Sequence, residues 1–234
     1  MAEEDLSIYS QITEVKENTK VTKVIMVRHA ESFANTEGKY QGQTYDTPLS
    51  DLGKKQARAL AGRLKNFGIK RIIASPLKRT HQTASEVAQA INCTIEVSSA
   101  IIETNHGNWE GKHKDWISQN YPDIFDMWLK FPGEVAFPNG ELFIETTKRT
   151  LDFLQNTHFT NDTLVVTHDN IVRAAISLIS NLDINNMWDI PLETASINIF
   201  EVNRVNGKNL FRVLKLNDVD HLVGVRNSVL KHAL

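Results

Sequence analysis

Cysteine is almost absent from this sequence: Cys93 is the only one among 234 residues. An intrachain disulfide and a CxxC metal-binding knuckle are therefore excluded, and a reducing compartment is the simplest interpretation. Long apolar runs are missing too, since the longest, IVRAAISLI, is interrupted by Arg173 and is too short to span a bilayer. The formal net charge of -2 gives no bulk attraction to nucleic acid or to an anionic membrane, so we expect neither as a partner.

Signals for nucleotide-binding loops and for targeting are also missing. Neither GxxxxGK[ST] nor GxGxxG occurs, which argues against a loop that cradles nucleotide phosphates. The start, MAEEDLSIYSQITEVKENTK, is acidic and polar and lacks the apolar core of a signal peptide. We therefore expect a cytoplasmic protein in which residues 1–22 form an N-terminal extension, in part disordered, and residues 23–234 form a single domain.

What the sequence does contain is an alternation of β-rich and amphipathic segments. We predict strands at residues 24–27, 71–75, 94–98 and 163–169, and helices at residues 51–67, 78–91, 140–156 and 170–180. In the helix over 140–156, Phe143, Thr147, Leu151 and Leu154 are expected to face inward. ASINIFEV and LFRVLKL form two final strands, joined at RVNG by a hairpin-like turn. This order predicts an α/β fold, a three-layer α/β/α sandwich around a mostly parallel sheet.

The section over residues 109–138 interrupts this alternation. It is broken by Pro122, Pro132 and Pro138, so we expect short helices that form a lid insertion. Its charges nearly balance, which leaves little to bind a second phosphate. Its aromatic residues have two interpretations, partly apolar walls of a site or packing within the lid; they are Trp109, Trp116, Phe125, Trp128 and Phe131.

Polar side chains follow the predicted strands at the edge where ligands bind in sheets of this kind. Arg28 and His29 follow the first strand, Arg79 lies about a helical turn beyond the second, and His168 ends the fourth. Glu103 follows an apolar pair in IIETNHGNWEG. A guanidinium grips two oxygens of an anion at once, and a neutral imidazole is a good nucleophile near pH 7. The set therefore predicts a phosphate site with a nucleophilic histidine.

Each of these residues has an ordinary interpretation when taken alone. His168 fits a hydrogen-bonded core histidine, Arg79 a charge on a helix surface, and Glu103 a solvated carboxylate at a strand end. The histidines lack the short spacing of HExxH or HxH metal sites, and the sequence shows no common face for His81, His106 and His113. We therefore expect no metal ion, and the phosphate interpretation depends on the four strand ends lying together.

The motifs resemble the histidine phosphatase superfamily, in its phosphoglycerate-mutase-like branch, and its broad-specificity phosphatase members most of all. The matching segments run from about Lys23 to Leu222; they are VRHAESFAN, QGQTYDTPLSDLGKKQA, ASPLKRTHQTA, IIETNHGNWEG, LVVTHDNIVR and LNDVDHL. The resemblance implies that His29 attacks phosphorus and that Glu103 moves the proton. It also implies a pocket for the phosphoryl oxygens, formed by Arg28, Arg79 and His168 with Asn35 assisting, and substrate contacts from Gln41 and Gly42. Asp169, which follows His168, is a further candidate for substrate binding.

The function implied by the resemblance is a metal-independent phosphatase that hydrolyses small phosphomonoesters through a phosphohistidine and needs no cofactor. Two alternatives stay open: a bisphosphoglycerate-dependent phosphoglycerate mutase, and a non-catalytic protein that binds phosphorylated ligands on the same fold. The short lid favours the phosphatase over the mutase. Neither the natural substrate nor the oligomeric state follows from the sequence.

One departure from the family pattern falls beside the second histidine. Relatives often have His-Gly-Gly where this chain has His168, Asp169 and Asn170. A carboxylate at position 169 either points into the pocket, where it disfavours highly anionic substrates, or caps the helix that begins there. The sequence favours capping.

Overall fold

A computed structural model describes residues 21–226, in which the strands form one six-stranded sheet in the order β3-β2-β4-β1-β5-β6. The strands are β1 (Thr22–Arg28), β2 (Arg71–Ala74), β3 (Ile95–Val97), β4 (Thr163–Thr167), β5 (Ile197–Val205) and β6 (Lys208–Asp218). The first four are parallel, while β5 and β6 are antiparallel additions at one side. The predicted mostly parallel α/β sheet is therefore confirmed.

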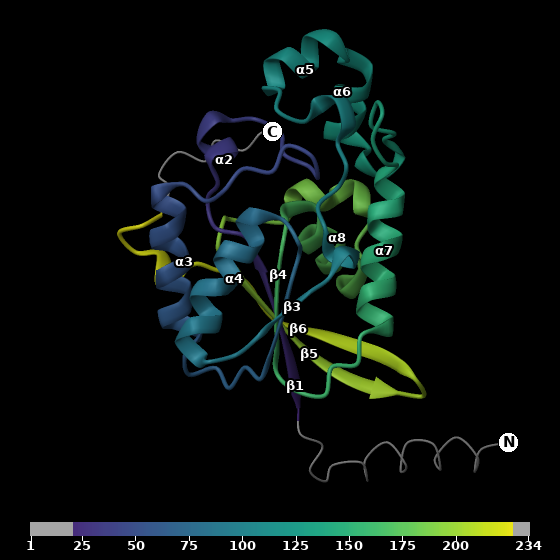
Figure 1. Ribbon diagram of the computed structural model, residues 1–234. Coiled ribbons are helices and arrows are strands. Elements are labelled where there is room, and N and C mark those ends of the chain that lie inside the picture. The colour runs from purple at the N-terminus through teal and green to yellow at the C-terminus, as the bar shows by residue number, and fades with distance from the viewer. Residues whose placement is uncertain (1–20, 227–234) are drawn as a thin grey trace, which may run out of the picture.

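Helices cover both faces of this sheet, with α3 (Asp51–Leu64) and α4 (Lys78–Ile91) on one face and α7 (Phe143–Asn156) and α8 (Asp169–Ser180) on the other (Figure 1). Successive β1 side chains enter opposite cores. Ile25 and Val27 pack with α3 and α4, whereas Val24 and Met26 pack with α7 and α8. Because both faces of the strand are buried, its sequence is continuously apolar rather than alternating.

The inward face of α7 differs from the prediction at one position. Phe143, Thr147 and Leu154 are buried as expected, but Leu151 is 40% exposed and Thr150 is buried in its place. Burial of this polar residue is tolerated because its hydroxyl donates to the Thr146 carbonyl one turn earlier, at 2.8 Å.

The predicted hairpin is confirmed. Strands β5 and β6 are joined by Asn206 and Gly207, whose φ angles are +50° and +79°. Two successive positive φ values fit the tight turns that match the twist of paired strands, and asparagine and glycine are the residues that adopt them most readily.

The lid insertion contains α5 (Lys114–Asn120) and α6 (Pro122–Lys130), which lie beyond the end of the sheet where α8 begins (Figure 1). Its core is aromatic and includes Trp109, Trp128 and Phe137. The remaining short elements are α2 (Phe33–Glu37), η1 (Ser99–Ile101), η2 (Gly107–Trp109), η3 (Pro132–Glu134), η4 (Ile184–Asp189) and η5 (Asp220–Leu222).

The predicted N-terminal extension lies outside the described residues except at its end, where Thr22 already belongs to β1. Over residues 21–226, none of the helices combines the length and the apolar character needed to cross a bilayer.

Candidate active site

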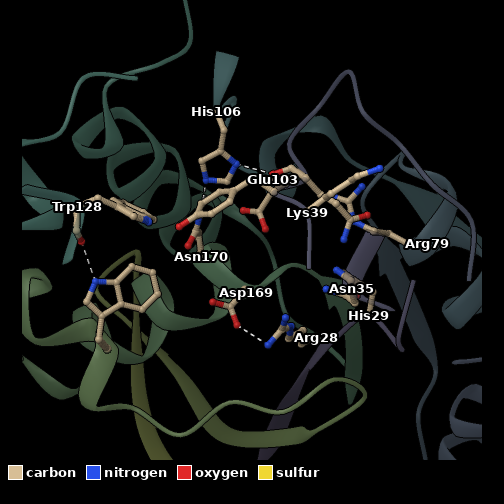
Figure 2. Close-up of a pocket in the computed structure, with 13 residues that line it drawn as sticks. Arg28, His29, Asn35, Lys39, Arg79, Glu103, His106, Trp128, Asp169 and Asn170 are labelled. Atoms are coloured by element: carbon tan, nitrogen blue, oxygen red, sulfur yellow. Dashed lines mark hydrogen bonds and ion pairs between the residues drawn. The ribbon is translucent and has the colours of Figure 1, made fainter. Parts of the chain in front are cut away.

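A pocket of about 550 Å³, including its open mouth, lies at the carboxyl ends of the parallel strands and beneath the lid (Figure 2). Its walls are formed by Arg28, His29, Asn35, Lys39, Tyr40, Gln41, Arg79, Glu103, His106, Trp128, Asp169, Asn170 and Trp188. The strand ends that the sequence analysis singled out therefore do converge.

His29 directly follows β1 and is 3% exposed. Its Nδ1 lies 2.7 Å from the Ala30 carbonyl oxygen, so Nδ1 carries the proton and donates it there. Nε2 then keeps its lone pair. Burial, reinforced by the positive charges of Arg79 and Arg28, lowers the pKa of His29 well below its usual 6.5. The ring is therefore neutral at pH 7 and nucleophilic through Nε2.

His168 ends β4 and lies against His29, with ring centroids 5.4 Å apart. Its Nε2 is 2.7 Å from the Ser75 hydroxyl, at the end of β2. Nδ1 is buried and has no hydrogen-bond partner among the described residues. Burial, followed by the charge of Arg79, lowers its pKa well below the usual 6.5. The Ser75 hydroxyl is able to donate to Nε2, and in that tautomer the ring proton lies on Nδ1, where it is able to donate to an anion.

The two arginines predicted to hold a phosphoryl group both line the pocket, and each is anchored at one end. Arg28 Nη1 pairs with Asp169 at 2.7 Å and donates to the Leu192 carbonyl. Arg79, in the first turn of α4, pairs with Asp46 at 3.2 Å and donates to the Gly42 carbonyl. The Nε atom of each arginine is buried and lacks a partner within residues 21–226, so each guanidinium retains donors for an anion.

Asn35 presents its amide nitrogen through a local capping arrangement. Its Oδ1 accepts from both the backbone N–H and the hydroxyl of Ser32, at 3.0 and 2.8 Å. Two donors on one oxygen fix the orientation of the amide and leave the NH₂ group to donate elsewhere. Because Asn35 lines the pocket, this geometry suits a phosphoryl oxygen.

Glu103 is 5% exposed in the pocket wall. Burial raises its pKa to about 7, even though Arg79 and the Thr104 amide favour the charged form. The residues on either side are held by α7 and the chain before it. Arg149 donates to the Ile102 carbonyl at 2.5 Å, and Glu141 accepts from the Asn105 amide at 3.0 Å. A carboxyl group with this pKa is able to give and to take a proton near neutrality.

Gln41 and Gly42 belong to a loop that is held by one carboxylate. Glu110 accepts hydrogen bonds from the backbone amides of Gln43, Thr44 and Tyr45. Gln41 lines the pocket, but Gly42 is not part of the wall and contributes its carbonyl to Arg79. A Cβ atom at Gly42 would lie 2.0 Å from the Glu110 carboxylate, which explains why glycine is needed there.

The preference for Asp169 as a helix cap is wrong. His168 occupies the N-cap position of α8 without a side-chain cap hydrogen bond, and Asp169 is the first helical residue. Its carboxylate lines the pocket and pairs with Arg28 at 2.7 Å (Figure 2). It also pairs with Arg173, at 2.8 Å. Two buried guanidinium groups outcompete backbone amides for this carboxylate because they offer charge as well as hydrogen bonds.

Several wall residues were missed by the sequence analysis or left without a role: Lys39, Tyr40, His106, Asn170 and Trp188. His106 packs edge to face against Phe137, and burial lowers its pKa to about 4. Its Nδ1 is bonded to the Gln41 carbonyl, so the unprotonated Nε2 accepts from the Asn170 amide at 3.1 Å.

The aromatic residues of the lid had two interpretations, as walls of a site or as packing within the lid. Trp128 fits both, because it is buried in the lid core and also lines the pocket, whereas Trp116 and Phe131 are exposed.

The fold and this geometry agree with comparisons to known proteins. The model of the histidine phosphatase superfamily, branch 1, matches residues 24–218. Phosphoserine phosphatase 1 of Hydrogenobacter thermophilus is 36% identical over 205 residues, covering 86% of this chain and 95% of that protein. Probable phosphoglycerate mutase GpmB of Escherichia coli is also 36% identical but only over 127 residues, covering 54% of this chain and 59% of that protein. The solved structure of YhfR from Bacillus stearothermophilus is 29% identical, with a TM-score of 0.78 over 86% of this chain and 99% of that chain.

The chain therefore belongs to branch 1 of the histidine phosphatase superfamily. Within it, the predicted class of enzyme, a phosphoric monoester hydrolase of the histidine phosphatase type, is confirmed. The mutase alternative is the weaker one, because the relative that carries that name matches a shorter part of the chain.

Proposed function

We propose that this protein hydrolyses small phosphomonoesters by way of a phosphohistidine at His29, with Glu103 as the acid and base, and without a metal ion. The observation that carries the proposal is that one pocket holds both a group suited to attack phosphorus and a group suited to donate a proton. A buried imidazole is held neutral with Nε2 available, and a buried carboxyl group has a pKa of about 7.

In the first step, His29 Nε2 attacks phosphorus while the bond from phosphorus to the ester oxygen breaks. Glu103, protonated, gives its proton to that oxygen, which leaves as an alcohol. Arg28, Arg79 and Asn35 hold the phosphoryl oxygens, and His168 donates from Nδ1. Their fixed donors neutralise charge that spreads over these oxygens in the transition state, where phosphoryl transfer needs most help.

In the second step, water attacks the phosphohistidine and Glu103, now a carboxylate, takes the water proton. The bond between phosphorus and Nε2 breaks, which returns the neutral imidazole and releases inorganic phosphate. The enzyme regains its starting protonation because the proton that Glu103 gave to the alcohol is replaced by one from water.

The walls of the pocket bear on the substrate class. Trp128 and Trp188 give one side an apolar surface beside the polar groups that would hold the phosphoryl group. Phosphoserine is the first natural ester to assay, because a relative matched over 86% of this chain is named for it. The cytoplasmic location stays a prediction from the sequence.

The test follows hydrolysis of para-nitrophenyl phosphate and phosphoserine with and without EDTA, in the native sequence and in His29→Ala. We expect activity that EDTA leaves unchanged and that His29→Ala abolishes. His158→Ala is the matched control, since this histidine is exposed and outside the pocket wall. Rapid quenching should also trap an acid-labile phosphate on the native chain and none on His29→Ala.

Three outcomes would contradict the proposal: activity lost on chelation, unchanged turnover in His29→Ala, or no hydrolysis of any phosphomonoester despite ligand binding. The last would support the non-catalytic alternative. Conversion of 3-phosphoglycerate that requires added bisphosphoglycerate would support the mutase.

A further inference from the structure

We propose that Asp169 makes this pocket select phosphate esters whose leaving group is cationic or neutral over esters whose leaving group is anionic. The inference rests on the proposed function and names the substrate class of that same site. It concerns the first of the two positions, Asp169 and Asn170, where the second histidine motif departs from the common glycines.

The placement of Asp169 is set by its neighbours on three elements. It begins α8 directly after His168, and its two oxygens pair with Arg28 at the end of β1 and with Arg173 one turn along α8. Arg173 is anchored by the Met187 and Ile190 carbonyls and is 4% exposed. With both guanidinium groups fixed, the carboxylate is held rigidly where it lines the pocket.

The positive charges around the phosphate site are partly offset by carboxylates. Arg79 pairs with Asp46, and Arg28 pairs with Asp169, which also pairs with Arg173. Without Asp169, both Arg28 and Arg173 would lose this compensating charge. A further negative group on the substrate would be repelled by Asp169, and a positive group would be attracted to it, over a short distance and with limited screening by water.

Lys39 is an opposing influence in addition to the arginines, because it also lines the pocket and would attract a carboxylate. Its ammonium group pairs with Glu37 at 2.9 Å, and the two side chains are 27% and 46% exposed. Asp169 is 19% exposed. The more buried charge is screened less, so the effect of Asp169 on substrate choice is the larger one.

The test compares two esters of similar size and opposite charge, phosphoethanolamine and phosphoglycolate. Their kcat/KM ratio is measured in the native sequence, in Asp169→Asn and in Asp169→Gly. Both variants should lower the ratio of cationic to anionic ester by about tenfold, the size expected for one partly screened charge. Taking the ratio removes any common effect of the variants on the phosphoryl group, because both esters carry the same one.

Asp51→Asn is the control for loss of one negative charge, since Asp51 is 90% exposed on α3 and pairs with Lys54. It should leave the ratio unchanged. A ratio that stays at the native value in both Asp169 variants would overturn the inference, and so would an equal fall in the control.

Binding separates this inference from the proposed function. In His29→Ala, calorimetry should show tighter binding of phosphoethanolamine than of phosphoglycolate, and adding Asp169→Asn should remove the difference. This result would support the charge selection even if turnover proved absent. Equal affinities of His29→Ala for the two esters would overturn the charge selection even in an active phosphatase.

Discussion

The imidazole rings of His29 and His168 lie edge to face, 5.4 Å apart, and are fixed through different nitrogens. His29 is bonded through Nδ1 to the Ala30 carbonyl, and His168 through Nε2 to the Ser75 hydroxyl. One ring therefore offers a lone pair on Nε2 while the other offers Nδ1. In the proposed mechanism, these two rings of the same chemical type serve as the nucleophile and as a donor for the same phosphoryl group.

Ser75→Ala should lower kcat by about tenfold, the equivalent of one hydrogen bond of roughly 1.4 kcal/mol. Without the hydroxyl, His168 is no longer held in the tautomer that places the proton on Nδ1. Steady-state kinetics with phosphoserine would show the loss. Ser85→Ala is the control, because the Ser85 hydroxyl donates to the His81 carbonyl on the exposed side of α4. Equal rates in Ser75→Ala and the native chain would contradict the role of Ser75.

The pH dependence of kcat/KM should be set on the alkaline side by Glu103, whose pKa is about 7. The first step needs this group protonated, so kcat/KM for an alkyl ester such as phosphoserine should fall as pH rises above about 7. Because burial and the two arginines lower the pKa of His29, activity should persist below pH 6.5. A kcat/KM that keeps rising through pH 8 would contradict the acid role.

Glu103→Gln should lower kcat/KM for phosphoserine by about 10²–10⁴-fold, the usual contribution of a general acid. The loss should be much smaller for para-nitrophenyl phosphate, since nitrophenolate leaves without being protonated. Glu96→Gln is the control, because Glu96 is a carboxylate that pairs with Arg71 outside the pocket. Equal losses for both esters would show that Glu103 has a structural role instead.

We expect Arg149 to act as a positioning residue for Glu103, because it donates to the Ala100 and Ile102 carbonyls and pairs with Glu141. Arg149→Gln should lower kcat for phosphoserine by about tenfold, through misplacement of the acid. Removal of its positive charge should also move the alkaline limb to higher pH, since that charge lowers the pKa of Glu103.

Arg149→Lys, which keeps the charge, should restore the position of the alkaline limb even where kcat stays low. Arg204→Gln is the control for the loss of an arginine, because Arg204 bonds to Asn209 and Gln155 and is not part of the pocket wall. An alkaline limb that is identical in the native chain and Arg149→Gln would contradict the electrostatic part of this prediction.

Gly42→Ala should destabilise the fold by about 1–3 kcal/mol, the range for an overpacked site. The new Cβ would lie 2.0 Å from the Glu110 carboxylate, which is held by three backbone amides and by the Thr44 hydroxyl. Displacing this loop should also weaken inhibition by inorganic phosphate, because Arg79 loses its bond to the Gly42 carbonyl.

Thermal unfolding and the phosphate inhibition constant would measure the two effects of Gly42→Ala. The control is Gly62→Ala in α3, where a Cβ meets nothing within 4 Å and alanine favours the helix. A melting temperature that matches the native chain would show that the loop has room for the methyl group.

The sequence was sufficient for features that depend on local chemistry. The apolar run over residues 24–27, followed at once by Arg28 and His29, predicted a buried strand and a site at its end, because chain neighbours remain neighbours after folding. The Asn-Gly turn between β5 and β6 was predictable for the same reason, since its positive φ values suit those two residues.

Prediction was wrong where several neighbours compete for one group. Asp169 was expected to cap α8, but Arg28 reaches it from β1 and Arg173 from the next turn of its own helix. Leu151 was expected to face inward, but the turn of α7 buries Thr150 instead. In both cases the outcome depended on the partners that tertiary packing supplies.

The sequence by itself determined the α/β order of elements, the family and the residue types of the proposed catalytic group. Only the tertiary structure decided that His106, Asn170 and Trp188 line the pocket. It also decided that the Gly42 carbonyl accepts a hydrogen bond from Arg79 and that Asp169 faces the pocket. The physical reason is that the hydrogen bonds and conformation of a short segment depend mainly on residues that are adjacent in the chain. A wall is built from segments far apart in the chain, and their relative positions are set by how the helices and the lid pack on the sheet.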